Sequence, residues 1–72
     1  MKNKIEQLQI IITNLPKKYK KITVGKVLES NDEKLQDLKD WCIDFNKYQI
    51  NNGLNTLKNE NNFINISKSF SS

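Results

Sequence analysis

Apolar residues at the start of the chain recur at alternating steps of four and three. This spacing places them on one face of a helix that packs against another helix. Pro16 disfavours helical geometry in the residue before it and cannot supply an amide hydrogen inside a helix. The pattern therefore predicts a helix over about residues 2–15. Its apolar face is formed by Met1, Ile5, Leu8, Ile12 and Leu15.

The stretch after the Lys-rich connector is ambiguous. Its β-branched residues at positions 22–24 favour an extended chain. Val24 and Val27 nevertheless have helical spacing, and Thr23 is a good N-cap residue. An extended segment and a short helix over residues 23–29 therefore both stay open.

The central part of the chain predicts a long helix over about residues 31–52. Ser30 and Glu33 form the S-x-x-E pattern of a capping box. In a capping box the hydroxyl accepts from a first-turn amide and the glutamate reaches back to the serine amide. Gly53 follows as a residue that ends helices in a left-handed conformation.

The apolar residues of this long helix divide into a broad face and a narrow face. Two apolar faces imply two neighbours. We expect the broad face to meet the first helix in an antiparallel hairpin and the narrow face to meet a second copy of the chain, and the reverse assignment is also open. The broad face comprises Leu35, Leu38, Trp41, Cys42, Phe45 and Tyr48, and the narrow face comprises Ile43 and Ile50.

The chain after Gly53 is polar and rich in Asn, yet apolar residues persist to its end. Apolar side chains at 63, 66 and 70 follow the i, i+3, i+7 spacing of a short amphipathic helix. This segment either folds back to cover the hairpin or docks on an external partner. The external partner is preferred, because both faces of the long helix are already assigned.

The predicted architecture is therefore all-α. It comprises a helical hairpin that dimerises over residues 1–53, an Asn-rich linker over 54–62 and a partner-binding segment over 63–72.

Composition narrows the setting in which the protein works. The chain has 72 residues, a single cysteine and no histidine, so an intramolecular disulfide and the usual zinc-ligand sets are excluded. A reducing, cytoplasmic location is expected. The longest apolar run, Ile10-Ile11-Ile12, is far below the roughly 20 residues of a membrane span, and the N-terminal residues lack the apolar core of a signal peptide, so we expect no export. We expect no membrane association.

The net charge of +4 is unevenly distributed. A Lys-rich run precedes an acidic helix that would repel phosphates, so the charge pattern favours a solvated loop over nucleic-acid binding. The sequence also contains no Arg, the residue that makes bidentate contacts with guanine, which argues against sequence-specific DNA recognition. The candidate anion-binding residues are Lys17, Lys18, Lys20 and Lys21.

Catalytic chemistry has little basis in this sequence. Asp37, Asp40 and Asp44 lie on one helical edge, but no His, second carboxylate helix or glycine-rich phosphate loop accompanies them. The sequence therefore predicts a non-enzymatic protein without metal or cofactor. One such function is a small mobile-element regulator or inhibitor that binds a host or phage protein through an aromatic stripe containing Trp41 and Phe45.

Size, Lys/Asn/Ile-rich composition and the terminal NNFINISKSF segment together resemble a known family. It consists of internal scaffold proteins of the capsid morphogenesis protein B type, which staphylococcal pathogenicity islands use to redirect capsid size. The resemblance implies a homodimer inside the procapsid, in the cytoplasm of the bacterial host. It further implies that the C-terminal segment binds the helper phage's major capsid protein and favours a smaller shell. The matching capsid-binding residues are Phe63, Ile64, Ile66, Lys68 and Phe70.

Overall fold

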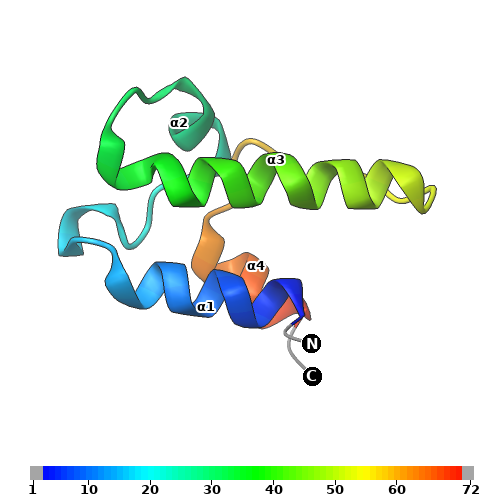
Figure 1. Ribbon diagram of the computed structural model, residues 1–72, viewed down its shortest axis with the longest axis horizontal. Helices are drawn as coiled ribbons and strands as arrows, with labels where there is room; N and C mark the ends of the chain where they lie inside the picture. Colours follow the sequence, from blue (N-terminus) through cyan, green and yellow to red (C-terminus); the bar gives the residue numbers. More distant parts are fainter. Residues whose placement is uncertain (1–2, 71–72) are drawn as a thin grey trace.

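The protein folds into short helices around one long helix. The structure, a computed structural model, describes residues 3–70, with Phe70 described by its backbone alone. Within this range the chain forms four α-helices and no strands, which confirms the all-α class. The helices are α1 (Lys4–Asn14), α2 (Val24–Glu29), α3 (Gln36–Asn51) and α4 (Phe63–Phe70), with 3-10 turns η1 (Lys17–Tyr19) and η2 (Glu33–Leu35) (Figure 1).

Helix α1 has well-defined ends. The Asn3 side chain accepts a hydrogen bond from the Glu6 amide at 2.8 Å, which satisfies one of the unpaired first-turn donors. At the other end Leu15 is extended, as Pro16 requires. The Lys20 ammonium donates to the Ile12 carbonyl at 2.6 Å and so satisfies an acceptor of the last turn. The predicted first helix is present, although Met1 lies outside the described residues.

The ambiguous stretch forms the short helix α2. The Thr23 hydroxyl accepts from the Lys26 amide and caps it, so the helical interpretation is confirmed. The predicted capping box is wrong, because the Ser30 hydroxyl accepts from the Asp32 amide instead. Asp32 in turn accepts from the Lys34 amide at 3.0 Å, and this local bonding shapes η2 ahead of α3. Helix α3 consequently begins at Gln36, later than residue 31.

Gly53 ends α3 as predicted. It adopts a left-handed conformation with φ of 70°, which glycine reaches without steric cost. The Gly53 amide donates to the Ile50 carbonyl, and the Leu54 amide donates to the Gln49 carbonyl at 2.8 Å. Both bonds belong to a Schellman motif, so the chain leaves the helix in a fixed direction.

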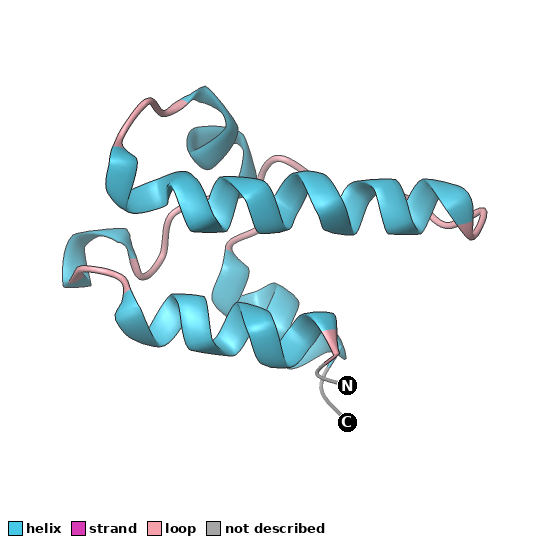
Figure 2. Cartoon of the chain, viewed as in Figure 1, coloured by secondary structure: helices cyan, strands magenta, loops and turns pink. Residues whose placement is uncertain are grey.

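Helices α1 and α3 lie across from each other and run in opposite directions, with α2 beside the N-terminal part of α3 (Figures 1 and 2). Trp41 sits at the centre of the packing. Its ring stacks on Phe45 with centroids 4.9 Å apart, meets Phe63 of α4 edge-on, and its Nε1 donates to the Lys4 carbonyl at 2.7 Å. The core consists of Leu8, Leu15, Val24, Val27, Leu35, Leu38, Trp41, Cys42, Phe45, Phe63 and Ile66.

Helix α4 packs against α1. Phe63 and Ile66 are 1% and 3% exposed and belong to the same core as α1 and α3. The Ser67 hydroxyl accepts a hydrogen bond from the Gln9 amide group at 3.3 Å. The segment therefore folds back over the chain, so a two-helix hairpin with a separate tail is too simple a description.

The Asn-rich connection is anchored to α2. The Val24 and Gly25 amides, which have no partner inside a helix of their own, donate to the carbonyls of Asn61 and Asn59 at 2.9 and 3.0 Å. A Cβ on Gly25 would lie 3.2 Å from the Asn59 Cβ, so glycine permits this close approach. The side chain of Asn62 then accepts from the Asn65 amide and caps α4.

Candidate interaction surfaces

The predicted capsid-binding residues are divided by the fold. Phe63 and Ile66 point into the core, so an external partner cannot reach them in this conformation. Ile64 is half-buried and Lys68 is exposed. The side chain of Phe70 lies outside the described residues. The part of the predicted site that remains on the surface is thus Ile64 with Lys68.

These two residues form one wall of a shallow groove between α4 and α1. The groove has a volume of about 210 Å³, and Ile12 and Thr13 of α1 line its other side. Helices α4 and α1 run in opposite directions, with the C-terminal end of α4 beside the N-terminal end of α1 (Figure 1). The groove combines an apolar centre with a basic side chain at its edge.

Most of the predicted core or dimer residues lie inside the chain. Leu8, Leu15, Leu35, Leu38, Trp41 and Phe45 are buried, and Ile5 and Ile12 pack partly against them. The broad face of α3, except for Tyr48, therefore meets α1 and α4 within one copy. Trp41 and Phe45 are each only 4% exposed, so they do not form the exposed aromatic stripe through which the alternative regulator would bind its partner.

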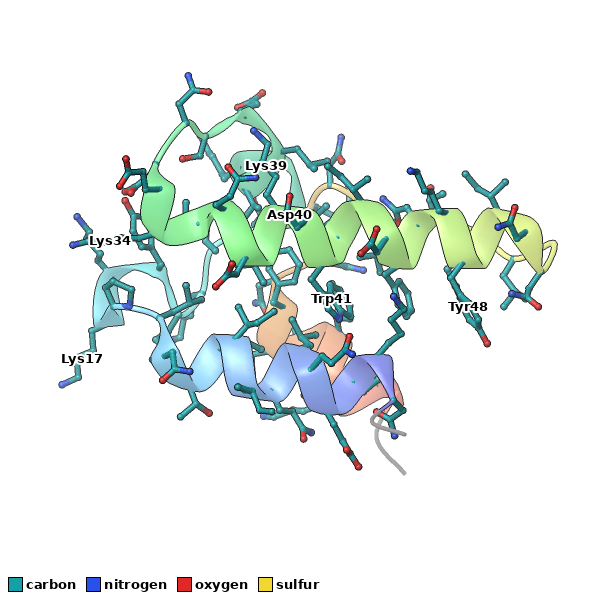
Figure 3. All side chains as sticks on the ribbon, in the orientation of Figure 1. Lys17, Lys34, Lys39, Asp40, Trp41 and Tyr48 are labelled. Carbon is teal, nitrogen blue, oxygen red and sulfur yellow. The ribbon has the colours of Figure 1, made fainter. Side chains whose placement is uncertain are left out.

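Three residues of that predicted set are exposed on α3. Ile43 and Ile50 are 42% and 63% exposed, and they lie seven residues apart on the side away from the core. Tyr48 is 51% exposed and projects from the part of α3 that extends past α1 (Figure 3). The narrow apolar face is thus left without a partner among residues 3–70.

The candidate anion-binding lysines serve different roles. Lys20 caps α1, whereas Lys17, Lys18 and Lys21 are exposed. Sequence reasoning missed Lys34, which lies at the same end of the molecule as Lys17 (Figure 3). Its position follows from folding alone, because no local pattern brings η1 next to η2.

The contact between η1 and η2 is made by Tyr19 and Asp32. The Tyr19 hydroxyl donates to the Asp32 carboxylate. This bond, helped by the Lys34 amide and the charges of Lys18 and Lys34, lowers the pKa of Asp32. The same bond raises the pKa of Tyr19. Asp32 therefore sits as a carboxylate among the lysines and reduces the positive potential of this end.

Other features of the described chain set limits on its chemistry. Burial raises the pKa of the Cys42 thiol to about 11, so this thiol stays protonated near neutral pH. Within residues 3–70 no group of three or more His, Cys, Asp or Glu side chains is placed to hold a metal ion. No helix in that range combines the length and hydropathy needed to cross a bilayer.

Sequence reasoning also missed a groove of about 490 Å³. It lies between the end of α3, the Asn-rich connection and α4. Its apolar lining includes Leu57 and Ile66, and its polar lining includes Asn55, Asn61 and Asn65. Only the asparagine-rich composition hinted at it, because the wall residues come from three separate segments.

Comparison of the chain with protein-family models, with curated proteins and with solved structures finds no match to any of the three.

Proposed function

We propose that this protein is a non-enzymatic assembly factor that binds a protein partner through the outer edge of α4. The observation that carries the proposal is the α1/α4 groove, where half-buried Ile64 and exposed Lys68 lie side by side with Ile12 and Thr13. An apolar anchor with an adjacent cation suits a weak contact with an acidic edge of a partner.

The specific partner that we propose is a phage major capsid protein. Support comes from the family resemblance, in which the C-terminal segment contacts the inner surface of the shell and redirects assembly to a smaller size. The fold modifies the proposed contact: Phe63 and Ile66 are buried and support α4, so Ile64 and Lys68 are the residues that we propose for the partner.

We include a homodimer in the proposal. The exposed pair Ile43 and Ile50 on α3 supports it, because an apolar row on one helix face is typical of a helix that meets a second helix. Two copies joined through α3 would carry two α4 edges. Weak contacts then gain avidity while each one remains reversible, as a removable scaffold requires.

The experiment is co-assembly with a candidate major capsid protein, followed by measurement of particle diameter by electron microscopy. The wild-type chain is expected to shift the population to smaller shells. The double variant Ile64→Ser with Lys68→Glu should restore the large shell, because it removes the apolar anchor and reverses the charge.

The matched control makes the same chemical changes away from α4 and from the outer face of α3, at exposed Ile10 and Lys21. Ile10→Ser with Lys21→Glu should still give small shells. Circular dichroism confirms that both variants are folded. Small shells with the folded groove variant would show that the α4 edge is not the contact.

A further inference from the structure

The groove beside the C-terminal end of α3 has side-chain amides that the fold leaves unused. Within residues 3–70, the side-chain amides of Asn55, Asn61 and Asn65 form no hydrogen bond, and only the backbone groups of these residues are paired. All three line the same groove of about 490 Å³. An asparagine side chain offers two donor hydrogens and one acceptor oxygen, so the groove presents several groups to a ligand.

Several other asparagines of the chain form side-chain hydrogen bonds that hold the fold together. Asn3 caps α1, Asn62 caps α4, and the Asn46 side chain accepts from the Leu57 amide at 2.9 Å. The Asn46 bond holds the connection against α3, with Gln49 donating to the Asn55 carbonyl at 3.1 Å. Asn46 and Gln49 therefore help to build the groove, whereas in the described part of the chain Asn55, Asn61 and Asn65 line it without side-chain hydrogen bonds of their own.

The groove has an apolar floor and one kind of charge. Half-buried Leu57 packs against the core at its base, and Leu54 is 55% exposed at its wall. The lining includes the exposed Lys58 and no carboxylate. Its chemistry thus combines apolar contact, amide hydrogen bonding and a single positive charge.

We infer that this groove binds an extended, acidic peptide segment of a partner protein. An extended chain exposes its main-chain amide and carbonyl groups to the asparagine side chains, and its alternate side chains point down to the apolar floor. Acidic side chains on the other face of the peptide then meet Lys58. The inference goes beyond the proposed function, because it concerns the opposite edge of α4 and any partner that carries such a segment.

The test is a titration of the isolated, ¹⁵N-labelled chain followed by NMR. The probe is the capped peptide acetyl-Asp-Leu-Asp-Leu-Asp-amide, with Lys and Ser in place of Asp as comparison peptides. The acidic peptide should shift the side-chain amide signals of Asn55, Asn61 and Asn65 saturably, with a dissociation constant of about 1 mM. The Lys peptide should bind more weakly.

Two variants with matched controls locate the contact. Lys58→Glu should weaken the acidic peptide by about fivefold and make the Lys peptide the tighter ligand, whereas Lys47→Glu on α3 should not. Asn55→Ala with Asn65→Ala should weaken all three peptides. Asn31→Ala with Asn51→Ala, which changes exposed amides outside the groove, should not.

Three results would overturn the inference: no saturable shift with the acidic peptide, shifts confined to another surface, or equal binding of all three peptides. The assay needs no capsid protein. A negative peptide titration therefore does not bear on the proposed capsid contact. A negative shell-size experiment likewise does not bear on peptide binding in the groove.

Discussion

At the scale of single residues, lysines that are neighbours in the sequence have different roles, because folding places them in different surroundings. Lys20 satisfies carbonyls at the end of α1, while Lys18 lies 5.0 Å from the centre of the Tyr19 ring. The KKYKK run is therefore only partly a solvated charge cluster. Its tyrosine connects two turns that are distant in sequence through the Asp32 carboxylate.

The Tyr19–Asp32 contact predicts a measurable pH effect. Because the pKa of Asp32 is lowered, the folded state favours the carboxylate, and this contribution to stability is present above the ordinary carboxyl pKa. It is lost as the pH falls through the lowered pKa. Tyr19→Phe removes the donor and should move the pKa of Asp32 back toward its ordinary value, as measured by NMR titration of the carboxyl carbon. Tyr48→Phe is the control, and an unchanged Asp32 titration in Tyr19→Phe would contradict the assignment.

At the scale of elements, one face of α4 belongs to the core and another face lies at the surface. Its inner residues Phe63 and Ile66 complete the packing around Trp41, whereas Ile64 faces the shallow α1/α4 groove. Deleting residues 63–72 therefore removes core as well as any partner contact. Single substitutions separate the two roles.

Phe63→Ala should destabilise the fold by about 3–5 kcal/mol, since it deletes a buried ring and leaves a cavity beside Trp41. Ile64→Ala should cost only about 1 kcal/mol, because the side chain is half-buried. Urea unfolding followed by circular dichroism measures both. Similar small losses for the two variants would mean that α4 does not contribute to the core in solution.

At the scale of the whole molecule, the question is what covers the outer face of α3. A chain of 72 residues buries a limited share of its surface, so association adds stability that a small core lacks. Ile43 and Ile50 are the residues through which we expect two copies to meet.

Ile43→Ser with Ile50→Ser should convert a dimer to a folded monomer, because it removes the apolar row without touching the core. Sedimentation velocity measures the change in mass. Ile10→Ser, which alters an exposed isoleucine on α1, is expected to leave the dimer intact. Wild-type protein that sediments as a monomer at high concentration would rule out the dimer, and a dimeric double variant would move the interface elsewhere.

Much of the element structure could be predicted from local signals. Pro16, Thr23 and Gly53 act on the backbone next to them, so the end of α1, the start of α2 and the end of α3 followed from sequence. The start of α3 did not, because Ser30 and Asp32 had several backbone amides within reach and the capping-box bond was not the one formed.

The sequence by itself determined the helical periods, the helix ends other than the start of α3, and the division of α3 into two apolar faces, since these depend on residues a few positions apart. Only the tertiary structure decided which face α1 and α4 would cover, and that Phe63 and Ile66 would turn inward. It also brought Lys34 to the end of the molecule that carries Lys17 and set three unpaired asparagines along one groove. These outcomes depend on contacts between segments distant in sequence, and an amphipathic segment has the same pattern whether its apolar face meets its own chain or another.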